Sequence, residues 1–294
     1  MVTVDTSKFT VTIDSGRPFH PSLIHREDDD PITLAILIDL TRSKDDLLPA
    51  LPGAIATLGL QALRPQDRVS VYAVSCNLVR FLVNAPADPT HLKAAVDSAL
   101  DSPLLYASGT SNTACAQNLH LWDAIAYINK ELSNLPGHRV ILAFTAGHDN
   151  GSRLTWKQAQ QDADSKGIAV FGLSQRAKFI FGSQNSVEAS FRLLCQLTGG
   201  LDRLTSASEL PDSLYLFLYM LRTRYIIEFP RPDNLSRGPH SIGVKLAKTH
   251  AFVRPSGLTV PIADPELLAD PTTIHSDPMK APDVGSRHIL SPNQ

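Results

Sequence analysis

Three side chains that carry oxygen atoms follow the first strongly apolar run of the chain. Residues 34–39 read LAILID and end in Asp39, and the hydroxyl residues Thr41 and Ser43 follow at alternate positions. Hard divalent cations take oxygen ligands, and Mg²⁺ retains several water molecules, so one carboxylate with two hydroxyls suits such an ion. The spacing therefore indicates a cation site, although Asp39 also fits a cap on a helix that begins near Ser43.

Two later stretches are candidates for bringing more polar groups to the same place. Residues 108–113 read SGTSNT ahead of a helical segment, and residues 145–152 read TAGHDNGS directly after the apolar run 140–144. The second stretch holds Asp149, whose Asp-Asn-Gly setting is also typical of a turn. It also holds His148, for which an exposed loop position is a simpler interpretation than a catalytic base.

Four short apolar runs indicate the strands that position these loops. They are continuous rather than alternating, as strands buried on both faces of a parallel sheet require. The runs are residues 34–39, 69–74, 140–144 and 168–173. Helical patterns lie between them, with Asp88-Pro89 as a helix start and Gly199-Gly200 as a helix end. We therefore expect a doubly wound, mostly parallel α/β sheet, with residues 78–83 as an antiparallel edge strand.

The segments on either side of this core predict a small β appendage. Strand patterns cover residues 9–13 and 19–23 before the core and residues 224–229 and 240–246 after it. Divided in this way, the chain has an N-terminal β flank at 1–30, a core at 31–222, C-terminal strands at 223–260 and a flexible proline-rich tail at 261–294. The acidic run 27–30 is interpreted as a solvated loop, with a cation site as the alternative.

The pattern Asp39-x-Thr41-x-Ser43 resembles the opening of the metal-ion-dependent adhesion site of the von Willebrand factor type A family. That site begins with Asp-x-Ser-x-Ser after the first core strand. The stretch LWDA at 121–124 is similar to the Leu-Tyr-Asp-Ala with which a helix of the family often begins. The resemblance implies a Rossmann-like sheet whose binding crevice lies beyond the carboxyl ends of the strands.

The end of the core carries the resemblance further along the chain. Residues 191–225, the pattern YIIEFP at 225–230 and the pattern HSIGV at 240–244 look like the end of a bacterial, notably acidobacterial, subfamily. The similarity spans roughly residues 9–260. It implies a non-enzymatic, adhesion-type module that binds a protein partner and is exported or held in the cell envelope.

The same resemblance implies a set of site residues. The metal ligands, for Mg²⁺ or Mn²⁺, would be Asp39, Thr41, Ser43 and Thr110 or Thr113, with Asp149 as a further candidate. The rim that contacts the partner would be formed by Arg42, Lys44, Ser111 and His148. An acidic side chain of the partner would then complete the coordination of the ion.

One position departs from the family pattern and keeps two alternatives open. The third loop normally has an aspartate directly before glycine, whereas this chain has Ala146 before Gly147. Because alanine offers no oxygen, the adhesion site is degenerate, and a metal-independent scaffold is the competing interpretation. A second alternative is anion or phosphate binding by Arg42, Ser43 and Lys44 at a helix start.

Composition and missing motifs exclude several other classes of protein. The 27 basic and 29 acidic residues nearly balance, so no overall field favours nucleic acid or an anionic membrane. No apolar stretch approaches the roughly 18 residues of a membrane span, and the start MVTVDTSKF lacks the features of a signal peptide. Neither Gly-x-Ser-x-Gly, Gly-x-Gly-x-x-Gly nor His-Glu-x-x-His occurs, so we expect no enzyme activity.

The three cysteines have neither zinc-site spacing nor the pattern of a disulfide framework. Cys195 lies in the apolar run FRLLC at 191–195, so we expect it to be a small core residue. Cys115 lies in a polar loop and is the better candidate for an accessible thiol, while nothing distinguishes Cys76.

Overall fold

The structure is a computed structural model of the whole chain. It describes residues 5–26, 30–41, 47–75, 77–102, 119–175, 185–230, 232, 235, 238–247 and 259–260. Several residues and segments named from the sequence lie outside this described part: the acidic residues 27–29, Arg42, Ser43, Lys44, Cys76, Thr110, Ser111, Thr113, Cys115 and the tail 261–294.

A six-stranded sheet forms the centre of the molecule, in the order β5-β4-β3-β6-β7-β8. Its strands are β3 (Ile32–Asp39), β4 (Arg68–Val74), β5 (Leu78–Pro86), β6 (His138–Phe144), β7 (Ala169–Gln175) and β8 (Asp202–Thr205). All neighbours are parallel except β4 and β5, which pair antiparallel at one edge. The predicted α/β fold class, with one antiparallel edge strand, is therefore confirmed.

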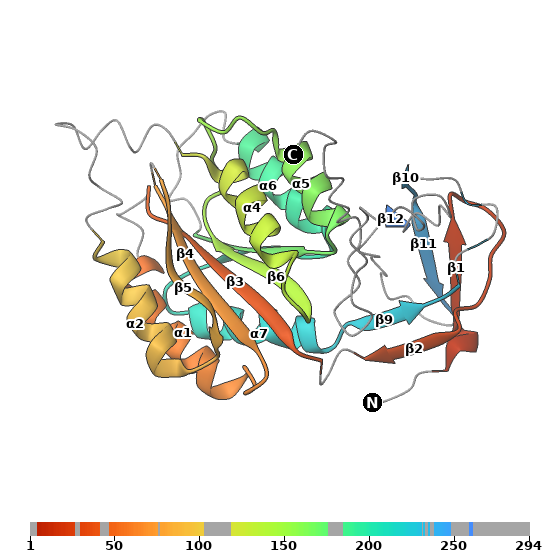
Figure 1. Cartoon of the computed structure of the whole chain (residues 1–294), viewed down its shortest axis with the longest axis horizontal. Helices are drawn as coiled ribbons and strands as arrows, with labels where there is room; N and C mark the ends of the chain where they lie inside the picture. The colour runs from red at the N-terminus through yellow and green to blue at the C-terminus, as the bar shows by residue number, and fades with distance from the viewer. Residues whose placement is uncertain are drawn as a thin grey trace, which may run out of the picture.

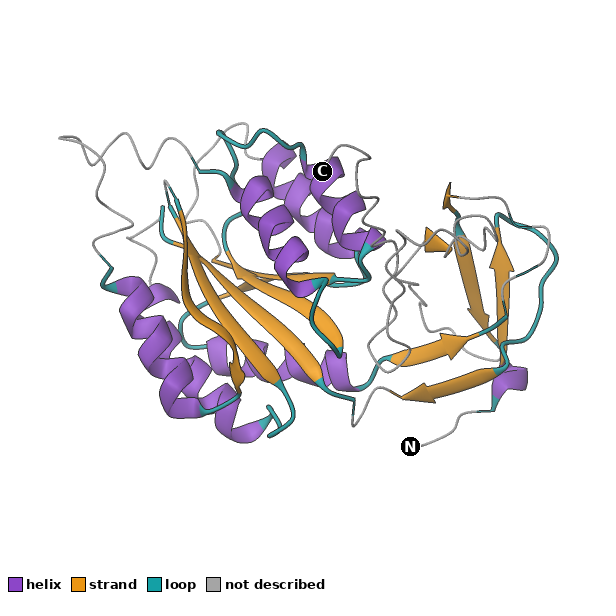
Figure 2. Cartoon of the chain, viewed as in Figure 1, coloured by secondary structure: helices purple, strands orange, loops and turns teal. Residues whose placement is uncertain are grey.

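Helices cover both faces of this sheet, as Figures 1 and 2 show. On one face lie α1 (Leu47–Gln61), α2 (Pro89–Leu100) and α7 (Leu210–Arg222), and on the other lie α4 (Leu121–Leu132), α5 (Trp156–Ser165) and α6 (Asn185–Leu197). Because both faces are covered, every residue of β3 is buried. Leu34, Ile36 and Ile38 belong to the apolar core on the side of α1, α2 and α7. Ala35 and Leu37 belong to the apolar core on the side of α4, α5 and α6. This explains why the first strand reads as a continuous apolar run.

Local sequence signals set the ends of several helices. The Asp88 side chain accepts a hydrogen bond from the N–H of His91, with Pro89 in the first helical turn. Thr155 and Gln158 form a reciprocal capping box at the start of α5. After α6, Gly199 has a φ of 81°, a conformation that favours glycine. Each short turn thus directs its helix back onto the sheet.

A buried carboxylate connects the first two strands of the core to its last helix. Asp67 is fully buried and accepts hydrogen bonds from the N–H groups of Ile32 at 2.9 Å and Arg64 at 2.7 Å. It also forms an ion pair with Arg222 at the end of α7. Because a buried charge is tolerated only when it is paired and hydrogen-bonded, these contacts join the starts of β3 and β4 to the last core helix.

The two flanks of the core pair with each other to form the appendage drawn at the right of Figure 1. Strand β1 (Phe9–Ile13) is antiparallel to β11 (Ile242–Leu246), and β2 (Leu23–Arg26) is antiparallel to β9 (Tyr225–Glu228). A third short pair joins β10 (Gly238–Pro239) to β12 (Thr259–Val260), and a 3₁₀ turn at Thr6–Lys8 precedes β1. This confirms the predicted β appendage.

One strand lies at other residues than predicted from the sequence. Residues 19–23 were expected to form the second flank strand, but the strand begins at Leu23, and Phe19 makes only an isolated bridge to Val11. The turn at Asp14-Ser15 has φ values of 49° and 60°, and it returns the chain beside β1. The ladder with β9 starts further on, at the register Leu23↔Glu228.

Candidate functional site

The first group of site residues lies at the carboxyl end of β3. Asp39 is only 6% exposed, and each of its carboxylate oxygens accepts hydrogen bonds. Oδ1 accepts from the N–H of Thr41 at 3.0 Å and from the Thr41 hydroxyl at 2.6 Å, and Oδ2 accepts from the Thr145 hydroxyl at 2.7 Å. Of the residues predicted for this place, the structure thus brings Asp39 and Thr41 together.

Thr145 belongs to this site although no role was predicted for it from the sequence. Strand β6 runs beside β3 with Ile38 opposite Phe144, so the next residues, Asp39 and Thr145, meet at the sheet edge. The Thr145 hydroxyl also accepts the N–H of Gly147 at 3.0 Å, which shapes the start of the third loop. A hydroxyl residue directly after an adjacent parallel strand was the signal available in the sequence.

The described residues do not by themselves form a complete metal site. Asp39 is the only carboxylate in this group, and three donors from Thr41 and Thr145 already occupy it. Ala146 adds no side-chain oxygen at the next position. Within the described part of the chain, no group of three or more His, Cys, Asp or Glu side chains could hold a metal ion. The three hydrogen bonds fix the orientation of the Asp39 carboxylate.

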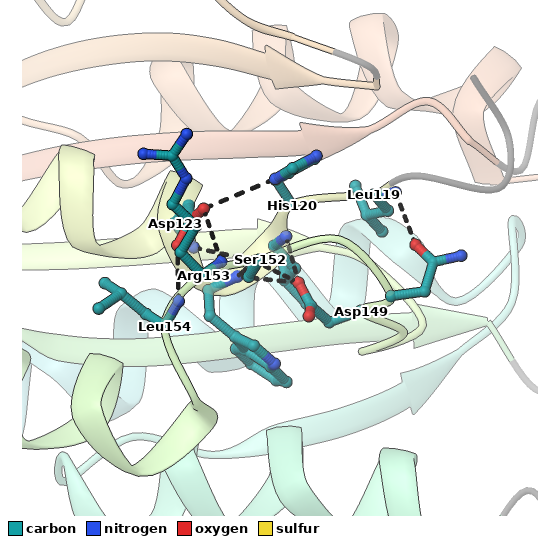
Figure 3. A network of polar contacts seen from close by, with 10 residues as sticks. Leu119, His120, Asp123, Asp149, Ser152, Arg153 and Leu154 are labelled. Carbon is teal, nitrogen blue, oxygen red and sulfur yellow. Dashed lines mark hydrogen bonds and ion pairs between the residues drawn. The ribbon is translucent and has the colours of Figure 1, made fainter. Parts of the chain in front are cut away.

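Asp149 lies at the amino end of α4, where it caps the helix from the third loop (Figure 3). Its Oδ1 accepts from the N–H of Leu121 at 2.7 Å, from that of Trp122 at 3.3 Å and from the Ser152 hydroxyl at 2.5 Å. The first N–H groups of a helix lack partners within the helix and attract negative charge. The role of Asp149 in the structure is therefore that of a capping residue supplied by a distant segment.

The capping is reciprocal, because the helix also binds the loop. The Asp123 carboxylate in the first turn of α4 accepts the N–H groups of Arg153 and Leu154, each at 3.0 Å. The Ser152 hydroxyl accepts the N–H groups of Trp122 at 3.1 Å and Asp123 at 3.2 Å. We call residues 119–123 together with residues 149–154 the loop latch. Its two sides are joined through both backbone and side chains (Figure 3).

Two further contacts tighten the loop latch. Asn150 accepts the N–H of Leu119 at 2.7 Å, and the Leu119 carbonyl accepts from Asn150 and Gly151. His120 pairs with Asp123 at 3.5 Å, and its ring packs so close to Gly151 that an added Cβ would lie 2.8 Å from Nε2. Burial opposes ionisation of Asp123, but its backbone hydrogen bonds and His120 outweigh that effect and lower the pKa of the carboxyl below its ordinary value.

The remaining predicted site residues fall into two groups. His148 lies in the described third loop and is partly exposed, next to the loop latch. Ser43, Thr110, Thr113, Arg42, Lys44 and Ser111 lie outside the described residues. The arrangement that is visible can hold loops in fixed positions at one end of the sheet. It shows no activated nucleophile among the described residues.

Two other sequence predictions concern a cysteine and membrane-spanning helices. Cys195 of α6 is fully buried in the core, which confirms the prediction, and burial raises the pKa of its thiol. No helix within the described segments has both the length and the apolar character to cross a membrane.

The chain was compared with protein-family models, curated proteins and solved structures. Neither the protein-family models nor the curated proteins contain a match to the chain. Among solved structures, the proximal thread matrix protein 1 of the mussel byssus is 9% identical, with a TM-score of 0.51 over 70% of this chain and 49% of that chain. Human Sec24c of the COPII coat is 13% identical, with a TM-score of 0.43 over 63% of this chain and 32% of that chain.

A third similar structure is the conserved hypothetical protein BatB of Bacteroides thetaiotaomicron. It is 17% identical, with a TM-score of 0.46 over 64% of this chain and 98% of that chain. The chain thus spans 32% of Sec24c and 49% of the mussel protein. At such identities the similarity concerns the fold, which is a von Willebrand factor type A-like α/β fold.

Proposed function

We propose that this protein is a non-enzymatic module that binds a protein partner through the loops at the carboxyl edge of its sheet. The observation that carries the proposal is the loop latch, which holds the segment before α4 and the segment after β6 together at this edge. In open α/β sheets this edge is where ligands bind. A pre-organised loop surface lowers the entropic cost of binding a partner.

The metal requirement of this surface is the finer part of the proposal. The Asp39-x-Thr41-x-Ser43 pattern supports a degenerate adhesion site, in which the loop hydroxyls would take Mg²⁺ or Mn²⁺ and an acidic side chain of the partner would complete its coordination. In the competing form, the loops bind a partner without an ion, and the hydrogen bonds of Asp39 to Thr41 and Thr145 are compatible with both forms. Ala146 supplies no side-chain oxygen to the site, so we propose that any bound cation is held weakly.

Two further parts of the proposal concern the kind of partner and the cellular location of the protein. The near balance of acidic and basic residues offers no support for a nucleic acid partner. Phosphate binding by Arg42, Ser43 and Lys44 is the remaining small-ligand alternative. The resemblance of residues 191–244 to a bacterial subfamily supports a location outside the cytoplasm or in the envelope.

The experiment is affinity capture from a cell-envelope extract, with the captured proteins identified by mass spectrometry. The wild type is compared with Arg42→Glu/Lys44→Glu, which reverses two charges on the predicted rim. The matched control, Lys93→Glu/Lys130→Glu, reverses two charges on exposed parts of α2 and α4. A partner retained by the control and lost from the rim variant supports the loop surface. Equal retention by both variants contradicts it.

A chelator arm and a calorimetric arm separate the forms of the proposal. If capture survives chelator and titration with Mg²⁺ or Mn²⁺ gives no heat, the metal-independent form is supported. If chelator abolishes capture, and binding heat disappears in Asp39→Asn, the adhesion-site form is supported instead. Thermal stabilisation by phosphate that disappears in Arg42→Ala indicates the anion alternative.

A further inference from the structure

The two edges of the central sheet differ in how they are protected from pairing with a strand of another chain. Strand β5 at one edge pairs with β4 through register shifts near Val71, and Asn84 in β5 has a φ of 44°. Bulges of this kind are a common means of preventing a sheet edge from pairing with another chain. Strand β8 at the other edge has a regular register with β7, and no described strand pairs with its outer side.

The backbone of β8 can pair with a further strand. The Leu201 carbonyl accepts the N–H of Gly172 in β7, so alternate residues of β8 face β7. By this alternation in a parallel ladder, the N–H and carbonyl of Leu204 are directed away from the sheet. Its side chain is 45% exposed.

A shallow apolar hollow lies beside this edge, between α7 and strands β7 and β8. Its lining includes the partly buried Leu216 and Met220 of α7 and also Arg203 of β8. Arg203 donates from Nε to the Ser213 hydroxyl at 3.2 Å. Within the described part of the chain no carboxylate forms an ion pair with Arg203. Its guanidinium therefore offers further donors beside an apolar surface.

We propose that the outer edge of β8 is a second interaction surface, which binds an extended peptide segment of a partner whose side chains on one face, at every second position, are acidic and apolar in turn. The open backbone of Leu204 selects an extended segment, because only a strand can satisfy it repeatedly. On the α7 side of the added strand, an apolar residue covers Leu216 and Met220, and a neighbouring acidic residue pairs with Arg203. This surface runs along the side of the sheet and does not depend on the loop surface.

The test uses a defined peptide with the whole chain. The probe is a fluorescently labelled heptapeptide, acetyl-Thr-Glu-Thr-Leu-Thr-Glu-Thr-amide, and its control has lysine in place of glutamate. Fluorescence anisotropy measures binding to the wild type, to Arg203→Glu and to Arg192→Glu, a matched charge reversal at an exposed position of α6. We expect Arg203→Glu to weaken binding of the acidic probe at least tenfold and to favour the lysine probe. Arg192→Glu should bind like the wild type.

Two further measurements test the backbone pairing. N-methylation of the probe on one set of alternate residues should abolish binding, and methylation on the other set should leave it, because a strand presents only one set to an edge. The amide resonance of Leu204 should shift on saturation with the probe. Absence of saturable binding, equal binding by Arg203→Glu, or an unmoved Leu204 amide overturns the proposal. Sedimentation that shows a dimer through this edge, lost on Leu204→Lys, also overturns it and assigns the edge to a second copy.

Discussion

A buried carboxyl that forms no ion pair with the described residues makes the stability of this protein depend on pH. Asp164 near the end of α5 is only 7% exposed, and its Oδ1 has no hydrogen-bond partner in the part of the chain that the structure describes. Its other oxygen accepts from Gln160. Burial raises the pKa of this carboxyl from its ordinary 3.8 to about 7, against the smaller opposite effect of the Gln160 hydrogen bond. The folded protein therefore holds a proton that the unfolded chain releases.

The sign and size of the effect follow from linkage. Because the pKa of Asp164 is raised on folding, its stabilising effect is complete below pH 3.8 and is lost as the pH rises through about 7. The shift in pKa corresponds to a ceiling of about 4 kcal/mol. Since Gln160, its hydrogen-bond partner, is partly exposed, we allow for solvent screening and expect about 2 kcal/mol.

The perturbation is Asp164→Asn, which keeps the shape and removes the ionisation. Thermal unfolding followed by circular dichroism between pH 4 and pH 8.5 should show similar midpoints for variant and wild type near pH 4. At pH 8 the variant should be more stable, with a midpoint about 4–8 °C higher. The control is Asp97→Asn on α2, whose partly exposed carboxylate pairs with Lys93. Parallel pH profiles for Asp164→Asn and wild type, or a variant that is less stable at pH 8, would refute the reasoning.

Three further outcomes are expected from features described above. Asp149→Ala should destabilise the protein by about 1–2 kcal/mol in urea unfolding, because α4 loses its cap; Asn150→Ala is the milder comparison, and an unchanged midpoint for Asp149→Ala would contradict the capping role. Asp67→Ala should cost about 3–5 kcal/mol, since it removes the buried carboxylate that pairs with Arg222 and accepts two backbone N–H groups; a loss below 1 kcal/mol would show that the pair is not effectively buried. Cys195 should resist maleimide labelling in the native protein and react in urea, and mass spectrometry of the peptide 191–195 would reveal native labelling if its burial were wrong.

Much of the fold was predictable because strands that are buried on both faces have continuous apolar sequences. The four continuous apolar runs match β3, β4, β6 and β7, and the Asp88-Pro89 pair marks the start of α2. The short edge strand β8 was missed because its sequence, DRLT, is polar and lies where only one neighbour stabilises it. A strand at an edge has no need of an apolar pattern on both faces.

The candidate site was less predictable, because its main contacts join segments far apart in the sequence. Asp39 and Thr41 are two residues apart, and their pairing followed from a motif. Thr145 meets Asp39 only through the register of β3 against β6, which no local pattern specifies. In the same way Asp149 was interpreted as a turn residue or a ligand, whereas it caps a helix that begins 28 residues earlier.

The pairing of the two flanks determines when, during synthesis, the appendage can form. Strand β2 meets β9, with Arg26 opposite Tyr225, so about 200 residues must leave the ribosome before this ladder can close. At synthesis rates of roughly 5–20 residues per second, the first strands wait on the order of 10–40 s without their partners. The closure of so long a loop becomes inexpensive once the α/β core has formed, because the core brings its own ends together. We therefore expect the appendage to be assembled after the core, so that its completion follows synthesis and folding of the domain between its strands.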